Sequence, residues 1–80
     1  MPERLETIIA GALRLPESEI TDALEFHGTH AWDSLNHVAL ILSLEAEYGI
    51  SIPDEVIVEL TSVRAIRAFV AGLPTALTYH

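Results

Sequence analysis

The run from Ser34 to Tyr48 contains no proline, no glycine and few β-branched residues, which makes it the strongest helix signal in the chain. Asp33 stands directly before the run, where an N-cap residue is expected. Gly49 follows it and can take the left-handed backbone conformation that closes many helices. We therefore predict one helix over residues 34–48, around which a chain of 80 residues has to build its single core.

An amphipathic helix is predicted before this run, over residues 3–15. Its apolar residues recur at helical spacing: Leu5, Ile8, Ile9, Ala12 and Leu13. Pro16 is expected to end it. Between residues 16 and 32 turn-forming residues alternate with scattered apolar ones, so we expect a long loop with room for one helical turn. Loops of this length are uncommon in compact domains and are often functional.

A short helix is predicted after Gly49. Residues 50–53 read as an extended link, because the residue before Pro53 is pushed away from helical conformation. Asp54 follows as a candidate cap, and the short helix is expected to run through Leu60.

The last helix is expected to begin after Thr61 or Ser62 and to run through about Ala71, with a loose tail over residues 73–80. Residues 1–80 are then one domain of all-α class. Its expected architecture is a small four-helix bundle with a long first loop and a short third helix.

The charge of the chain disfavours several kinds of partner. There are twelve acidic residues, four arginines and no lysine, and between Arg14 and Arg64 every charged residue is acidic. Such a surface repels phosphate backbones and anionic lipids, so we expect no binding to nucleic acid or to a membrane. Basic protein partners are the natural complement. The alternative is that the acidity only aids solubility.

Hydropathy and cysteine content set further limits. The longest unbroken apolar run, residues 38–42, is too short to cross a bilayer. The first residues resemble neither a secretory signal nor a lipidation motif, so a cytoplasmic location is expected. Without cysteine there is no disulfide and no thiolate metal ligand, and packing has to hold the fold.

Ser34 is the leading candidate for chemistry. It follows the predicted N-cap, so its hydroxyl is expected in the first helical turn, exposed and close to unpaired backbone amides and the positive end of the helix dipole. A phosphate ester would be well placed there. The alternative is an ordinary first-turn serine, and the tripeptide Asp33-Ser34-Leu35 alone does not decide between the two.

The wider context resembles the centre of an acyl carrier protein. Members of that family have an Asp-Ser-Leu attachment site, an acidic end to the following helix, an aromatic residue, an Ile-x-Ile-Pro-Asp-Glu link and a Thr-x-Val start of the last helix. All occur here in order, at residues 33–35, 45–47, 48, 50–55 and 61–63. The resemblance implies that Ser34 carries 4′-phosphopantetheine covalently, with Asp33 and Leu35 beside it in the cofactor site.

The same resemblance implies a carrier and not an enzyme. Ser34 would be modified by a phosphopantetheinyl transferase that uses coenzyme A and supplies the magnesium and the catalytic groups. The carrier would then present thioester-bound acyl groups to loading and processing enzymes with basic docking patches. Tethering raises the effective concentration of the acyl group at each of these enzymes. The chain itself is expected to be a monomer.

Partner contacts are also implied by the resemblance, at Leu35, Leu42, Glu45, Glu47, Ile52 and Glu55. For the two leucines, packing in the core is the alternative. Asn36, Ala39 and Ala46 replace acids that many fatty-acid carriers have, which weakens the acidic face. Trp32 stands beside the attachment site, where it is expected either to pack on the loop or to touch the arm.

The expected cargo is short or polar. Ile57 and Ile66 match positions that are often smaller in fatty-acid carriers, and larger side chains there would fill the pocket for an acyl chain. This favours a specialised, polyketide-type pathway over general fatty acid biosynthesis.

Rival interpretations start from the histidines and the acidic surface. A metal site is not expected, since no third ligand has regular spacing, and His27, His30 and His37 are predicted to make surface or loop contacts. Asp33, Ser34 and His37 contain the residue types of a hydrolase triad but lack its surroundings. An acidic helical interaction module without a prosthetic group and a discrete aminoacyl carrier remain as alternatives.

Overall fold

The computed structural model describes residues 4–73, which form four α-helices, one 3-10 turn and no β-strand. The elements are α1 (Leu5–Leu13), the 3-10 turn η1 (Glu17–Glu19), α2 (Ser34–Tyr48), α3 (Asp54–Ile57) and α4 (Val63–Ala71). The predicted all-α class, the long first loop and the short third helix are confirmed. None of the described helices is long and apolar enough to span a membrane.

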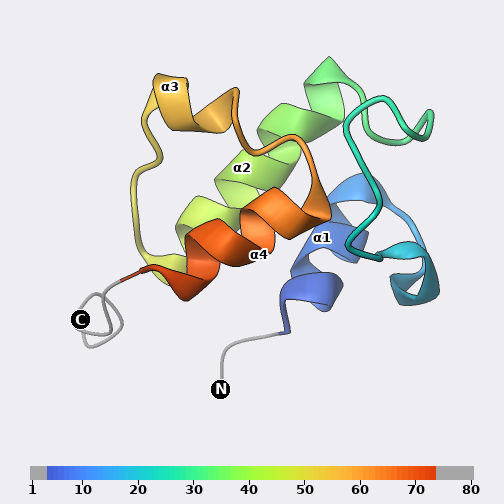
Figure 1. Ribbon diagram of the computed structural model, residues 1–80, viewed down its shortest axis with the longest axis horizontal. Helices are drawn as coiled ribbons and strands as arrows, with labels where there is room; N and C mark the ends of the chain where they lie inside the picture. The colour runs from blue at the N-terminus through green and yellow to red at the C-terminus, as the bar shows by residue number, and fades with distance from the viewer. Residues whose placement is uncertain (1–3, 74–80) are drawn as a thin grey trace.

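The core lies between α2 and the helices around it. Figure 1 shows α2 running diagonally across the molecule behind α4, with α1 to one side and α3 to the other. The largest fully buried side chains come from α1, α2, α4 and the first loop: Ile9, Leu13, Trp32, Leu40, Leu44, Val63 and Ile66. Burying these side chains is the main favourable contribution to folding in a domain without disulfides.

The first helix ends earlier than predicted. Arg14 takes the left-handed conformation, with φ 59° and ψ 43°, so α1 stops at Leu13 and not at residue 15. Only the residues from Arg4 on are described, so the predicted start at residue 3 lies outside this range. Arg4 is extended and precedes the first helical residue. The predicted tail likewise lies outside the described residues from residue 74 on.

The long loop between α1 and α2 is fixed to the rest of the protein near its middle, at Leu24 and Phe26. The backbone amide of Phe26 donates to the carbonyl of Thr61 at 2.8 Å, and the amide of Val63 donates to the carbonyl of Leu24 at 3.0 Å. These bonds tie the loop to the start of α4. Further along the loop, the fully buried Trp32 accepts from the amide of His27 at 2.9 Å and donates to the carbonyl of Thr29 at 3.1 Å.

The short third helix differs from the prediction. It covers only residues 54–57, and its N-cap is Pro53, with no side-chain cap from Asp54. Asp54 is itself the first helical residue, where a carboxylate favours the helix dipole. The last helix is as predicted, because the Ser62 hydroxyl accepts from the amide of Ala65 at 3.0 Å and α4 ends at Ala71.

Candidate functional site

Ser34 is the first residue of α2, and its side chain is exposed. Asp33 before it is extended, and its Oδ1 accepts a hydrogen bond from the amide of Asn36 at 2.9 Å. The predicted N-cap is therefore confirmed. Asn36 in turn donates from its side chain to the carbonyl of Ala31 at 2.7 Å, so the chain enters the helix in a fixed direction. The serine hydroxyl thus has a defined position on an open surface.

An open hollow of about 420 Å³ adjoins the start of α2, lined by His27, Gly28, Thr29, His30 and Asp33. A Cβ at position 28 would approach the carbonyl oxygen of Glu25 to 2.8 Å, so the turn requires glycine. His27 next to it has φ 67°, a conformation that is uncommon for a residue with a side chain. His27 and His30 are exposed, as predicted.

Of the surface or loop contacts predicted for His37, the structure shows the loop contacts, to Trp32 and Phe26, and not a surface position. Its side chain is buried, with 8% of the residue exposed. The indole Nε1–H of Trp32 donates to its Nδ1 at 3.0 Å, and its Nε2 lies 3.1 Å from the carbonyl oxygen of Ile57. Both ring nitrogens are engaged, so His37 is not placed to act as a base for Ser34. The hydrolase interpretation therefore has no support in the geometry.

Trp32 packs in the protein interior. Of the two positions expected for it, packing on the loop or contact with the arm, the structure shows packing. Trp32 is fully buried, and its ring is nearly parallel to that of His37, with an interplanar angle of 27° and a centroid distance of 6.2 Å. Its indole is therefore engaged in the interior, where the N–H donates to His37. Among residues 4–73, no group of three or more histidine, aspartate or glutamate side chains is arranged to hold a metal ion.

Apolar side chains are exposed along α2 and after α3. Leu35 is 78% exposed, Leu42 59%, Val38 54% and Val58 71%. The core alternative for the two leucines is therefore wrong. Leu35, Val38 and Leu42 lie on one face of α2 by their spacing of three and four residues. The exposure of Val38 and Val58 was not predicted from the sequence. An apolar residue type alone does not show whether the side chain points into the core or towards solvent.

The predicted partner residues differ from one another in how far they are exposed. Ile52 is only 5% exposed and belongs to the core, so it offers almost no surface to a partner. Glu45 is half-buried, and its Oε2 accepts from the backbone amide of Ile52 at 2.7 Å. Glu55 is exposed in the first turn of α3. The position of Glu45 thus has a structural role that was not foreseen.

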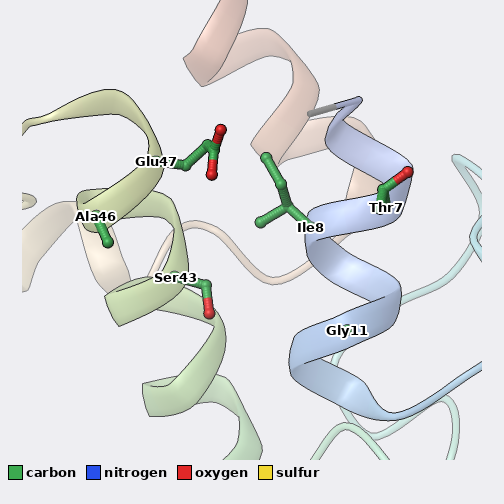
Figure 2. A pocket seen from close by; sticks show the side chains of 6 residues that line it. All are labelled: Thr7, Ile8, Gly11, Ser43, Ala46 and Glu47. Atoms are coloured by element: carbon green, nitrogen blue, oxygen red, sulfur yellow. The ribbon is translucent and has the colours of Figure 1, made fainter. Parts of the chain in front are cut away.

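Glu47 lines a second open hollow of about 420 Å³, between α1 and α2. Figure 2 shows Ser43, Ala46 and Glu47 on α2 across from Thr7, Ile8 and Gly11 on α1. Glu47 is half-buried, away from the exposed Leu35 end of the same helix.

The two isoleucines singled out for cargo lie at the core. Ile66 is fully buried on α4, and Ile57 at the end of α3 is half-buried and packs against the core. Both side chains occupy volume in or beside the bundle interior.

The fold and this site define a class of protein: a small helical domain that exposes a serine at the start of its longest helix, with the following His37 bound to Trp32 and Ile57 and not to that serine. The phosphopantetheine attachment site family matches residues 3–70 of the chain. The chain belongs to this family. It is therefore a carrier protein and not a catalyst, and 4′-phosphopantetheine is its covalent cofactor.

Proposed function

We propose that Ser34 is the attachment residue and that the protein presents acyl groups as thioesters to partner enzymes. The observation that carries this is the exposed Ser34 at the first position of α2. The surroundings fit a phosphodiester, since the hydroxyl stands at the positive end of a 15-residue helix and beside an open hollow. The bound group supplies a thiol for the acyl cargo.

Attachment makes the protein a substrate of a phosphopantetheinyl transferase. The Oγ of Ser34 forms a bond to the phosphorus next to the pantetheine of coenzyme A, and adenosine 3′,5′-bisphosphate leaves. The hydroxyl proton has to pass to a base of the transferase, because His37 is committed to Trp32 and Ile57. Asp33 keeps the serine at the helix start by capping Asn36.

Intact mass spectrometry tests the assignment. The protein is incubated with coenzyme A, Mg²⁺ and a broad-specificity transferase, and we expect one phosphopantetheinyl adduct. Ser34→Ala should abolish it, whereas Ser51→Ala, at another exposed serine, should leave it unchanged. No adduct on the wild-type protein would favour the rival interaction module without a prosthetic group. An adduct that survives Ser34→Ala would place the attachment elsewhere.

Partner enzymes are proposed to dock on the exposed face of α2 and the end of α3. Leu35 and Leu42 were expected there, and Val38 and Val58 extend the apolar surface. The exposed carboxylates of Asp54, Glu55 and Glu59 lie next to Val58 in the chain and favour partners with a basic rim. Glu55→Gln should slow modification by the transferase more than Glu17→Gln, a matched charge removal on η1. Equal rates would remove α3 from the docking surface.

The cargo is proposed to be short or polar, in a specialised pathway of the polyketide type. The buried Ile66 and the half-buried Ile57 support this, because they take up interior volume that a long acyl chain would need. Amide chemical shifts of the core can be compared between two-, four- and eight-carbon acyl forms. Large shifts of core amides with the eight-carbon chain alone would refute the proposal. Aminoacyl loading remains the alternative within carriers.

A monomer in the cytoplasm is part of the same proposal. The net charge of −8 disfavours self-association through repulsion. Sedimentation equilibrium tests the oligomeric state.

A further inference from the structure

His37 is a buried ionisable side chain that attachment to Ser34 does not use. It is the single buried polar or charged residue in the described range 4–73. It stands three residues after Ser34, one helical turn further into α2. Its ring contacts two aromatic rings of the first loop, Trp32 at 6.2 Å and Phe26 at 5.3 Å between centroids. The first loop, α2 and α3 therefore meet at this one imidazole.

The hydrogen bonds of His37 fix its protonation state. An indole nitrogen can only donate, so the bond from Trp32 Nε1 requires His37 Nδ1 to be an unprotonated acceptor. The neutral ring then carries its proton on Nε2, which donates to the carbonyl of Ile57 at 3.1 Å. The geometry thus needs one neutral tautomer.

The helix that receives this bond depends on such contacts. α3 has only four residues and no side-chain cap, and a helix of that length does not persist without tertiary support. Two side chains of α2 bind the segment around it. Glu45 accepts from the amide of Ile52 before α3, and His37 donates to Ile57, its last residue. The amide of Leu60 donates to the same Ile57 carbonyl at 3.2 Å.

We propose that neutral His37 is a positioning residue that holds α3 against the Ser34 end of α2, and that protonation of its ring releases α3. A protonated imidazole carries N–H groups on both nitrogens, so its Nδ1–H would face the indole N–H of Trp32. Two donors in one buried contact leave both unsatisfied, which is costly. The ring has to leave this position, and the bond to Ile57 is lost with it.

No charged side chain of the neighbouring elements is hydrogen-bonded to His37 to offset this cost. Its two ring nitrogens bond to Trp32 and Ile57. Eight ionisable residues lie nearest in sequence to these contacts, and all are exposed. They are Glu25, His27 and His30 on the loop, Asp33 at the start of α2, Asp54, Glu55 and Glu59 in the α3 segment and Arg64 on α4. Their carboxylates favour a positive charge through space but are screened by water.

The release would change the docking surface, since Glu55 lies on α3 and Val58 directly after it. This consequence rests on the proposed function, whereas the movement of α3 itself does not. The first test therefore uses the unmodified protein. Failure of Ser34 to accept phosphopantetheine would leave the role of His37 standing, and absence of the movement would leave the carrier assignment standing.

A pH titration by NMR reads the contact directly, because Trp32 is the sole tryptophan and gives one indole N–H signal. As the pH is lowered, the indole signal and the amides of residues 55–59 should shift together in a single transition. The circular dichroism of the helices should stay nearly constant, which separates release of α3 from global unfolding.

His37→Gln is the conservative variant for this test. A glutamine amide can donate to the carbonyl of Ile57 but does not titrate, so the joint transition should disappear while α3 stays in place. His30→Gln is the matched control at an exposed histidine and should keep the wild-type transition. A wild-type protein whose α3 amides do not move, or a His37→Gln protein whose amides move equally, overturns the proposal.

Trp32→Phe provides a second variant that keeps a ring but removes the indole donor. Without an N–H facing Nδ1, protonation of His37 meets less opposition, and the transition of the α3 amides should occur at higher pH than in the wild type. An unchanged midpoint would contradict the assigned role of the Trp32 bond, even if His37→Gln failed to fold.

The functional consequence is measured as a rate ratio. The initial rate of transfer onto Ser34 should fall for the wild type relative to His37→Gln as the pH decreases, with both proteins assayed in the same buffer so that the pH response of the transferase cancels. A constant ratio would separate α3 release from docking and refute this consequence.

Discussion

At the scale of single residues, Glu45 stands where an acidic docking residue was expected, yet its carboxylate is bound to backbone. Its Oε2 accepts from the amide of Ile52 at 2.7 Å and so fixes the extended link after α2. A charged acceptor makes such a bond stronger than a neutral one. The contact with Ile52 and the proposed docking contact therefore fall on one side chain, and an alanine variant alone would remove both.

Glu45→Gln and Glu45→Ala separate the two roles. Glutamine keeps an acceptor oxygen, so the free energy of unfolding of Glu45→Gln in urea should stay within about 0.5 kcal/mol of the wild-type value. Alanine removes the acceptor, so the free energy of unfolding of Glu45→Ala should be lower by about 1 kcal/mol. If the charge serves docking, both variants slow modification by the transferase equally. Equal stability of the two variants would show that the bond to Ile52 does not hold the link.

At the scale of elements, the ends of the helices carry much of the local information. α2 begins at a side-chain cap and ends at a left-handed glycine, and both ends were visible in the sequence. α1 ends at Arg14, which takes the same left-handed conformation at a cost that glycine avoids. The two helix ends are therefore similar in geometry and unequal in strain.

The strain at Arg14 predicts opposite effects at two positions. Arg14→Gly should raise the free energy of unfolding by up to about 1 kcal/mol, and Gly49→Ala should lower it by about 1 kcal/mol. A Cβ at position 49 meets no atom within 4 Å, so the expected loss comes from the backbone alone. Arg14→Ala is the control, since it removes the side chain without relieving φ. A gain as large as that of glycine would contradict the explanation.

The cap of α2 gives the second prediction at this scale. Asp33→Ala should cost about 1 kcal/mol of stability in urea denaturation, because the amide of Asn36 loses its acceptor. Asp33→Asn should be close to the wild type, since asparagine is an equally good N-cap. Comparing their rates of modification then shows whether the transferase needs the charge. An alanine variant as stable as asparagine would rule out the cap.

At the scale of the whole molecule, Arg67 joins parts of the chain that are distant in sequence. Its guanidinium lies 2.9 Å from the carboxylate of Glu6 on α1 and 3.0 Å from that of Asp22 in the first loop. These hydrogen bonds raise the pKa of Arg67 above its ordinary value. The chain has only four basic residues, and this arginine offsets part of the repulsion between the acidic side chains of α1 and of the first loop.

Glu6 gives the pH prediction for the whole fold. A hydrogen bond from its own backbone amide, followed by the bond from Arg67, lowers the pKa of Glu6 below its ordinary value of 4.5. The folded state therefore favours the carboxylate. Its contribution to stability is full above pH 4.5 and is lost as the pH falls through the lowered pKa.

Urea denaturation of the wild type and of Glu6→Gln over this pH range measures the effect. We expect the variant to be less stable by about 1 kcal/mol or less at neutral pH, since Arg67 is partly exposed. The difference should shrink as the solution is acidified below pH 4.5. Glu17→Gln, at an exposed acid on η1, is the control. If the difference in free energy of unfolding between the wild type and Glu6→Gln grew as the pH fell, the predicted direction of the pH dependence would be wrong.

Short-range features were predictable because they depend on neighbours a few residues apart. The N-cap Asp33, the end at Gly49 and the cap Ser62 follow from local hydrogen bonding and backbone conformation. The order of motifs likewise indicated the phosphopantetheine family that the comparison shows. Sequence by itself thus determined the number and order of the helices, the long loop and the candidate serine, but not the ends of α1 and α3.

Only the tertiary structure decided which side chains are buried and paired. Ile52 was expected to contact partners but lies in the core, and His37, for which surface or loop contacts were expected, is buried and links Trp32 to α3. The pairing of Arg67 with Glu6 spans 61 residues. Such contacts depend on where distant segments meet, and helical spacing within one segment carries no information about that meeting.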